Sequence, residues 1–310
     1  MMSQAWEEID QATARRLLAL APRLPFEQGW AHAQAMAATG MAAMRFLALG
    51  EEAVATICER RWWGLWPVRE CLRGPVWIRP PGSGGSTDAA MDGFMRMAFR
   101  RHPFAMSFWT TDLADAHHAD AVARRAGMRR VMTGHATAIV PVLAEPLAQR
   151  ALLHGKWRNA LAAAEARGRL RAHATRERRA VVEVVERYEG LRRARGFAGP
   201  PGRMLAAMAT LEEPGRVFAV VAERGAATAA AGLFFVHGDE ATWVAGFSTP
   251  DGRKEGGHRL VLMAALAELR RMGVARLDLG GVATDGAPGI TRFKLGLGGS
   301  LAVLPGTWGR

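Results

Sequence analysis

The chain has 310 residues, of which 49% are hydrophobic and 23% charged, and this composition excludes a disordered, collagen-like or coiled-coil protein. Its length suits two domains, and its ten Trp, twelve Phe and fifteen Met residues can fill sizeable cores. Two cysteines, Cys58 and Cys71, are too few for a disulfide framework or a zinc site, and we expect no bound metal. Because neither a secretory signal nor a bilayer-spanning apolar run is visible, we expect a soluble cytoplasmic protein.

The net charge of +12 is concentrated in the second half of the chain. Residues 151–310 carry 24 Lys and Arg against 15 Asp and Glu, whereas residues 1–150 carry 17 against 14. A basic half indicates a polyanionic partner such as nucleic acid, nucleotide phosphates or an anionic membrane; a solvated Arg-rich surface is the alternative. Only three basic residues are lysines: Lys156, Lys254 and Lys294. In a chain that uses Arg so consistently, a remaining lysine indicates a place for a compact ammonium group.

The hydrophobic pattern of the first half alternates between helical and extended periodicity. In chain order, the predicted elements are helices at 10–21 and 26–39, strands at 42–49, 53–57 and 75–78, a loop at 80–86, helices at 88–99 and 112–127, and a strand at 137–143. An aromatic loop contains Trp62, Trp63 and Trp66. We expect these rings to pack in the core or between domains, with a substrate platform as the alternative.

The second half gives a similar mixture of helices and strands. The predicted elements are helices at 147–154, 156–167 and 176–195, strands at 217–222, 229–236 and 242–246, a helix at 258–272 and a strand at 274–279. The 176–195 helix is rich in arginine and either is solvated or faces tRNA. The order of elements predicts an α+β fold with helices on partly antiparallel sheets.

A short loop precedes the predicted 258–272 helix, at a place where backbone N–H groups and a helix N-terminus attract anions. Its sequence, Arg253-Lys254-Glu255-Gly256-Gly257-His258, resembles the Arg/Gln-x-x-Gly-x-Gly/Ala pyrophosphate loop of GNAT acyltransferases, which bind acyl-CoA. Arg253 and Gly256 fit that pattern, whereas His258 stands where Gly or Ala is expected. An ordinary glycine-containing turn is the alternative interpretation.

Four segments together resemble Fem-type aminoacyltransferases, which build peptidoglycan interpeptide bridges. In chain order they are Arg73-Gly74-Pro75-Val76, Lys156-Trp157-Arg158-Asn159 continuing to Gly168, Leu277-Asp278-Leu279-Gly280-Gly281-Val282, and Pro288-Gly289-Ile290-Thr291-Arg292-Phe293-Lys294-Leu295-Gly296-Leu297-Gly298-Gly299. They are similar to that family's RGP strand, the opening of its second domain, its YDFGG strand end and its closing FKxGFGG motif. The long helical hairpin that some members use near tRNA is not found here.

The resemblance implies two tandem GNAT-like domains, expected at residues 1–145 and 146–310, each a mixed, mostly antiparallel sheet flanked by helices. It further implies acyl or aminoacyl transfer to an amine on a small molecule, peptide or peptidoglycan precursor. No cofactor is expected to be tightly bound, and the donor is aminoacyl-tRNA or, alternatively, acyl-CoA. A catalytically inactive RNA-binding or envelope-associated adaptor with the same fold is the third possibility.

Amide formation requires a neutral amine, an acceptor for its proton and positive charge near the developing oxyanion. Lys294, within the closing motif, is our candidate for that charge, and Arg292 could bind a phosphate or carboxylate. Asp278 follows a predicted strand and could accept the amine proton; capping a neighbouring turn is the alternative role.

Two further cations begin the 156–167 helix. There Lys156 and Arg158 oppose the favourable direction of the helix dipole, and a bound substrate phosphate would relieve that conflict. We therefore expect Lys156 and Arg158, together with Arg292, Arg253 and Gly256, to bind substrate.

Overall fold

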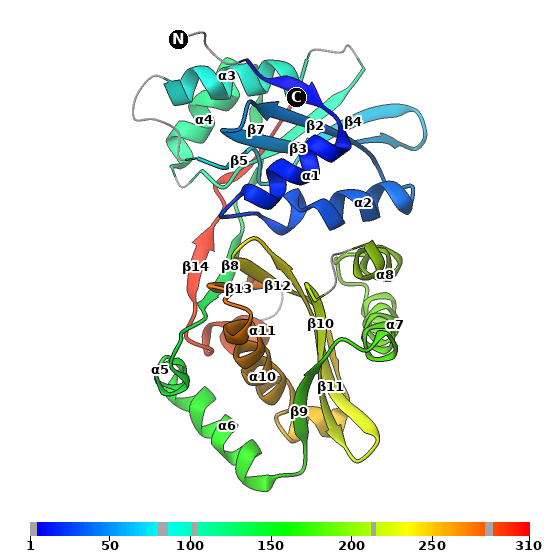
Figure 1. Cartoon of the computed structure of the whole chain (residues 1–310), viewed down its shortest axis with the longest axis vertical. Helices are drawn as coiled ribbons and strands as arrows, with labels where there is room; N and C mark the ends of the chain where they lie inside the picture. Colours follow the sequence, from blue (N-terminus) through cyan, green and yellow to red (C-terminus); the bar gives the residue numbers. More distant parts are fainter. Residues whose placement is uncertain (1–4, 80–85, 101–103, 114, 212–214, 283–287) are drawn as a thin grey trace. The chain divides into compact units, whose positions relative to one another are not determined.

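The computed structural model describes residues 5–79, 86–100, 104–113, 115–211, 215–282 and 288–310, and they form two compact units (Figure 1). The first unit comprises residues 1–135 and 303–310, and the second comprises residues 136–302. Each contains one mixed, mostly antiparallel sheet with flanking helices, so the α+β prediction is confirmed. Within these described ranges, none of the helices is both long and apolar enough to cross a membrane.

The first sheet has the strand order β1-β2-β3-β4-β6-β15-β7, with β5 paired to β3, and β4 and β6 run parallel. The elements of this unit are β1 (Glu7–Ile9), α1 (Gln11–Leu20), the 3-10 helix η1 (Phe26–Gln28), α2 (Trp30–Ala38), β2 (Ala43–Leu49), β3 (Ala53–Trp62), β4 (Trp66–Cys71), β5 (Val76–Trp77), α3 (Ser86–Ala98), β6 (Met106–Thr110), α4 (Ala116–Arg125), β7 (Arg129–Thr133) and β15 (Gly306–Gly309).

Separate apolar clusters hold the helices of the first unit on its sheet. Phe94 and Phe99 pack beside the buried rings of Trp109 and Trp308, whose centroids are 5.4 Å apart on adjacent strands. A second cluster joins Leu17 and Leu18 of α1 to Val54 and Val76. Since each buried aliphatic or aromatic side chain contributes roughly 1.5–3 kcal/mol, these clusters stabilise the unit substantially.

The second sheet has the strand order β14-β8-β13-β12-β11-β10-β9, with β12 and β13 parallel. The elements of this unit are β8 (Ala136–Pro141), α5 (Pro146–Ala151), α6 (Gly155–Arg167), β9 (Arg171–Thr175), α7 (Arg178–Arg195), α8 (Gly202–Leu211), β10 (Val217–Arg224), β11 (Ala227–His237), β12 (Glu240–Ser248), α9 (Pro250–Lys254), α10 (Gly257–Arg271), β13 (Arg276–Val282), α11 (Pro288–Leu295) and β14 (Ser300–Val303).

Helices cover both faces of the second sheet (Figure 1). The apolar side of α10 is buried in the main core against strands β10 and β11. On the opposite face, α7 buries Val181, Val184, Val185 and Tyr188, the periodicity that predicted this helix. Glycines in the left-handed conformation, Gly168 and Gly196, end α6 and α7.

The division into units differs from the expected boundary after residue 145 in two respects. Strand β8 belongs to the second sheet because it pairs with β13. Strand β15 returns to the first sheet, where it pairs with both β6 and β7. Hydrophobic periodicity locates strands but carries no information on which sheet each one joins.

Two local predictions are corrected by the structure. The helix expected at 26–39 is interrupted at Gly29, between η1 and α2. The side chains of Trp62, Trp63 and Trp66, expected to pack in a core or between domains, are exposed on a hairpin of β3 and β4. The aromatic composition suggested burial, but large apolar residues also occur on surfaces, particularly at binding sites. Residues 80–85 of the expected loop lie outside the described ranges.

Candidate functional site

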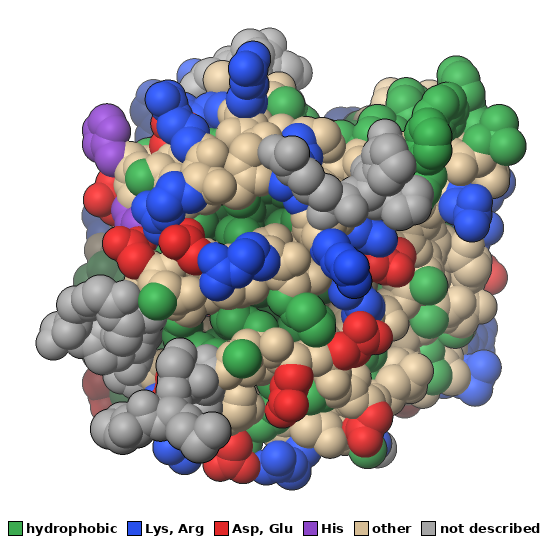
Figure 2. Space-filling model, turned by 90° about the horizontal axis from the view of Figure 1, so that it is seen from above, with side chains coloured by type: hydrophobic (Ala, Val, Ile, Leu, Met, Phe, Trp, Pro, Cys, Tyr) green, Lys and Arg blue, Asp and Glu red, His purple; other side chains and the backbone are tan. Residues whose placement is uncertain are grey.

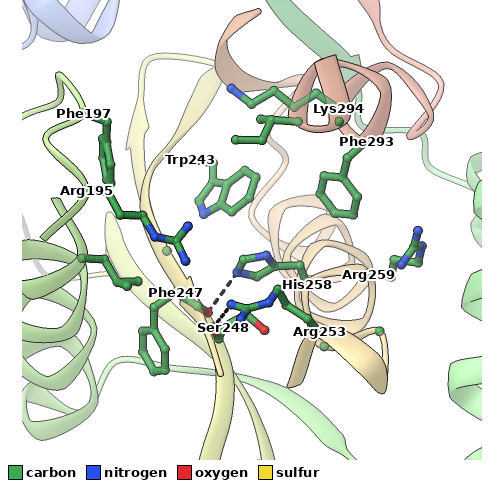
Figure 3. Close-up of a pocket in the computed structure, with 16 residues that line it drawn as sticks. Arg195, Phe197, Trp243, Phe247, Ser248, Arg253, His258, Arg259, Phe293 and Lys294 are labelled. Carbon is green, nitrogen blue, oxygen red and sulfur yellow. Dashed lines mark hydrogen bonds between the residues drawn. The ribbon is translucent and has the colours of Figure 1, made fainter. Parts of the chain in front are cut away.

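A cavity of about 420 Å³ lies in the second unit, beside the region where β12 and β13 part (Figure 3). The two strands pair through Glu240–Thr242 and Arg276–Asp278. Beyond this paired stretch, Trp243, Gly246, Phe247 and Ser248 of β12 line the cavity. Its described lining consists of Leu191, Arg195, Phe197, Trp243, Gly246, Phe247, Ser248, Arg253, Gly256, Gly257, His258, Arg259, Gly289, Ile290, Phe293 and Lys294.

Aromatic rings form much of the cavity wall. The ring of His258 lies edge-on to Trp243 at a centroid distance of 5.5 Å and 6.3 Å from the ring of Phe293. Trp157 of α6 lies outside the cavity and supports Phe293, with ring centroids 5.9 Å apart. Packed rings resist displacement, so the wall is expected to keep its shape when a ligand enters.

The rim of the cavity is basic. Arg195, Arg253, Arg259 and Lys294 lie along it, and the described lining residues include no Asp or Glu. In Figure 3, the Arg195 side chain extends toward the cavity from the side of α7, whereas Arg259 points away from its centre. The guanidinium of Arg259 lies over the rings of Trp157 and Phe293. This distribution of charge favours a ligand that carries negative charge or polarised carbonyl groups.

Lys294 extends from α11 over the cavity (Figure 3). Its Nζ donates a hydrogen bond of 2.7 Å to the carbonyl oxygen of Gly281, which fixes the direction of the side chain. Burial lowers the pKa of Lys294, and the nearby carboxylate of Asp278 opposes that decrease. The result is a partly desolvated cation beside the cavity, where its charge acts more strongly than in water.

The loop before α10 forms another part of the lining. Gly256 adopts a φ of +76° at the helix N-cap, and no side chain caps this helix. A Cβ at Gly256 would be 2.9 Å from that of Ala164, and one at Gly257 would be 2.7 Å from that of Ala230. Glycine is therefore required at both positions to bring the uncapped N-terminus of α10 beside the cavity.

Ion pairs hold this loop in place. The carboxylate of Glu255 accepts hydrogen bonds of 2.8 Å from both Arg167 and Arg169, and these bonds help to lower its pKa. Arg253 donates from Nη1 to the carbonyl oxygen of Ser248 at 2.8 Å. The loop is thus connected to the C-terminal end of α6, and α9, which precedes the loop, is connected to β12.

His258 is oriented by a backbone acceptor. Its Nε2 lies 2.9 Å from the carbonyl oxygen of Phe247, which can only accept a hydrogen bond. Burial lowers the pKa of His258 below its usual value of 6.5, and the charge of Arg253 acts in the same direction, while the backbone carbonyl groups of Phe247 and Ala231 oppose the decrease. A neutral imidazole that donates from Nε2 carries a lone pair on Nδ1, so His258 can accept a proton.

The structure brings three of the sequence-predicted site residues to the cavity: Lys294, Arg253 and Gly256. Asp278 is buried near Lys294, and its Oδ1 accepts a hydrogen bond of 2.7 Å from the backbone N–H of Gly280. This is the turn-capping role that we considered as its alternative.

The other three predicted residues do not line the cavity. Arg292 is exposed on α11, and Lys156 and Arg158 are exposed on the first turn of α6, where the buried Trp157 between them packs inward. Neighbours on a helix point in different directions, so one motif can contribute side chains both to a core and to solvent.

Sequence reasoning missed the aromatic wall and Arg195 as members of one site. Trp243 and Phe247 lie on β12, four residues apart, and no motif connects them with α7 or α11. His258 was noticed only as a departure from the glycine-rich pattern. Among the described residues, no group of three or more His, Cys, Asp or Glu side chains is arranged to hold a metal ion.

Comparison with known proteins supports the fold of both units. Residues 151–295 match the family model described as an Acetyltransferase (GNAT) domain. The crystal structure of FemX is similar over 98% of this chain and 96% of that chain, with 13% identity and a TM-score of 0.78. None of the curated proteins matches the sequence.

Two further solved structures share the arrangement. A tandem GNAT protein from the clavulanic acid biosynthesis pathway matches over 98% of this chain and 97% of that chain, with 14% identity and a TM-score of 0.55. The C-terminal domain of a putative lysylphosphatidylglycerol synthetase from Agrobacterium fabrum matches over 97% and 92%, with 14% identity and a TM-score of 0.58. At these identities, the likeness is one of fold.

Proposed function

We propose that the chain is an acyltransferase of the GNAT superfamily, whose family model matches residues 151–295, and that it transfers an aminoacyl group from aminoacyl-tRNA to an amine, as Fem-type enzymes do. The acceptor would be a muramyl-peptide precursor or another amine-bearing peptide. The observation that carries this proposal is the cavity with an aromatic wall and a basic rim, with Lys294 extending over it.

The proposed reaction follows from the chemistry of the lining. The acceptor nitrogen attacks the ester carbonyl of the donor, forming an N–C bond and a tetrahedral oxyanion, which the ammonium group of Lys294 stabilises. Nδ1 of His258 takes the proton from the attacking nitrogen. Collapse of the intermediate breaks the C–O bond, and the proton passes to the departing ribose oxygen.

His258 takes over the proton-accepting role that the sequence suggested for Asp278. Its imidazole lines the cavity, whereas the carboxylate of Asp278 is occupied with the N–H of Gly280. Asp278 instead supports the positive charge of Lys294, since it raises the pKa that burial lowers. In this proposal Asp278 is a positioning residue.

The position of His258 favours aminoacyl-tRNA as the donor over acyl-CoA. Its ring occupies the place where the pyrophosphate loop of GNAT enzymes carries Gly or Ala, so the closest approach of a pyrophosphate would be crowded. Arg195 and Arg253 supply positive charge without requiring that close backbone contact. The aromatic wall can accept an aminoacyl side chain.

Acyl-CoA is the second candidate donor, and specific features favour it. Arg253 and Gly256 match the pyrophosphate loop, and the uncapped N-terminus of α10 favours an anion. If acyl-CoA is the donor, it should bind saturably, and Arg253→Ala should abolish binding. Lys254→Ala, which removes the exposed neighbouring charge, is the matched control.

The main test incubates the purified full chain with a pool of tRNA charged with labelled amino acids and a muramyl-peptide acceptor. We expect label in the acceptor, and about a hundredfold or greater loss of kcat for Lys294→Met, the usual cost of removing an oxyanion donor. Lys254→Met, which removes an exposed ammonium group of the same unit, should retain activity. Absence of transfer from every charged tRNA would reject the proposal.

A further inference from the structure

The first unit carries a group of exposed apolar side chains at the end of the β3–β4 hairpin. Trp62 and Trp66 are cross-strand partners with 53% and 48% of their surfaces exposed. Trp63 and Leu65, in the turn between them, are 79% and 72% exposed. The rings of Trp62 and Trp63 contact each other at 5.1 Å rather than packing into a core.

A fifth apolar side chain joins this group through the register of the sheet. Strands β4 and β6 are parallel, with Val68 opposite Met106. Phe104, two residues before β6 begins, lies at the end of the sheet where β4 starts at Trp66, and it is 64% exposed. We call Trp62, Trp63, Leu65, Trp66 and Phe104 the aromatic tip.

The aromatic tip is costly to maintain on a free surface. Each exposed large apolar side chain leaves apolar surface in water that burial would remove. Trp63 also adopts a φ of +52°, a backbone conformation that is unfavourable for a bulky residue. Because its ring is exposed, burial of that ring does not compensate for the cost. Clustered exposure of this kind marks a binding surface.

Several arginines lie at the same end of the sheet as the aromatic tip. The C-terminal ends of α3 and α4 and the start of β7 meet there, because β4 and β6 begin at this end and β15 ends at it. Arg61, Arg96, Arg100 and Arg129 are exposed, and none pairs with a carboxylate in the part of the chain that the structure describes. We call these four residues the arginine border.

Two residues of the arginine border line a cavity. A cavity of about 770 Å³ has Arg96 and Arg100 in its lining, along with Arg124 and Arg125. Of these, Arg124 is paired with Asp120, and Arg125 with Asp92. In Figure 2, hydrophobic side chains gather at the upper right of the face, and Lys and Arg side chains are spread across it. The β3–β4 hairpin also points to the right in Figure 1.

We propose that this end of the first unit binds the surface of an anionic lipid bilayer. The aromatic tip inserts among the lipid headgroups, where Trp side chains are favoured because one part of the ring is apolar and its N–H is polar. The arginine border binds lipid phosphates, with Arg96 and Arg100 at the cavity that they line.

Charge and shape both favour a bilayer over a protein partner. The arginine border complements anionic headgroups, and each Arg near such a surface contributes about 1 kcal/mol. The aromatic tip is convex, with a cross-strand Trp pair and two exposed turn residues. A lipid bilayer can take up these projecting side chains because its headgroups and acyl chains rearrange around them. A protein partner would need a deep groove of complementary shape.

The test measures co-sedimentation of the full chain with vesicles of phosphatidylcholine alone and with roughly one quarter phosphatidylglycerol. We expect binding to the anionic vesicles only, and weaker binding as the NaCl concentration rises. The double variant Trp63→Ser/Leu65→Ser should weaken binding about tenfold or more, through lost apolar insertion. Arg96→Gln/Arg100→Gln should weaken it about thirtyfold, from about 1 kcal/mol per Arg.

Controls separate membrane binding from damage to the fold. Leu147→Ser removes an 81% exposed leucine of the second unit and should bind vesicles like the unmodified chain. Because every substituted side chain is exposed, all variants should unfold at similar temperatures. Vesicles containing brominated lipid should quench Trp fluorescence of the unmodified chain more than that of a Trp62→Phe/Trp63→Phe/Trp66→Phe variant.

Three outcomes would overturn the membrane proposal. The first is equal or absent binding to neutral and anionic vesicles. The second is binding that Trp63→Ser/Leu65→Ser leaves unchanged. The third is competition by tRNA that depends on the arginine border but not on the aromatic tip, which would make this surface a nucleic-acid site. Transferase activity on a soluble acceptor is measured separately, so failure of either proposal does not affect the other.

Discussion

The indole N–H of Trp157 donates a hydrogen bond of 3.1 Å to the backbone carbonyl of Phe293, connecting α6 to α11 across 136 positions of the sequence. The two rings also pack against each other. Phe293 lines the cavity, and the next residue is Lys294. The buried Trp157 therefore helps to position the helix that carries the proposed catalytic cation.

Trp157→Phe tests this connection, since it retains most of the packing and removes the N–H donor. We expect a loss of about 1 kcal/mol in the free energy of unfolding and a larger proportional decrease in kcat than in substrate affinity. Thermal unfolding together with steady-state kinetics would measure both. An unchanged kcat, despite the lower stability, would mean that α11 is held in place without this hydrogen bond.

The lowered pKa of Lys294 predicts an alkaline limit to activity. The ammonium group is the active form, so kcat/KM should decrease as the pH rises toward a value below the ordinary 10.5 of lysine. Hydroxylamine as acceptor keeps its own nitrogen neutral over this range. Lys294→Arg, which stays charged, should be less active but should lose this alkaline decrease. If both proteins show the same alkaline decrease, a different group is responsible.

His32 predicts acid sensitivity of the first unit. Its side chain is buried on α2, and burial lowers its pKa from 6.5 to about 4. Between these two values, the unfolded chain binds a proton that the folded chain does not, so stability is full above pH 6.5 and decreases as the pH falls toward 4. The decrease attributable to this residue is about 3 kcal/mol. Urea unfolding of His32→Leu at several pH values should show a weaker dependence in this window; an identical dependence would contradict the assignment.

Glu255 offers a test of the loop before α10. Replacing it with Gln removes the charge that holds Arg167 and Arg169, while the size of the side chain is retained. We expect weaker donor binding, seen as a higher KM, with kcat much less affected. Glu165→Gln, which breaks the exposed pair with Arg150 in the same unit, is the control. A similar KM for both variants and the unmodified enzyme would show that the ion pairs are not needed to shape the loop.

Local sequence signals predicted most of the second unit but less of the first. The apolar stripe of α7 and the glycine after it are properties of neighbouring residues, and both were recognised. Strands β6, β7 and β15 were not predicted. The pairing of β15 with β6 places Trp308 opposite Trp109, about two hundred residues apart in the sequence. A local sequence pattern cannot predict a contact between residues so far apart.

The candidate site could be predicted only in part, for a related reason. Lys294, Arg253 and Gly256 belong to short motifs, so the sequence identified them. Trp243 reaches the cavity because β12 continues beyond its pairing with β13, a property of the sheet and not of the residues around Trp243. Lys156 and Arg158 lie in an equally clear motif, yet the residue of that motif that packs toward the cavity wall is Trp157.

The return of β15 to the first sheet affects how this protein can be made and dissected. On the ribosome, the strand between β6 and β7 emerges only after the entire second unit has been synthesised, so the first unit cannot complete its sheet while the chain is still growing. A fragment that stops at residue 135 would leave β6 and β7 with unpaired edges that invite aggregation. An isolated first unit would therefore need residues 303–310 joined back to it by a linker.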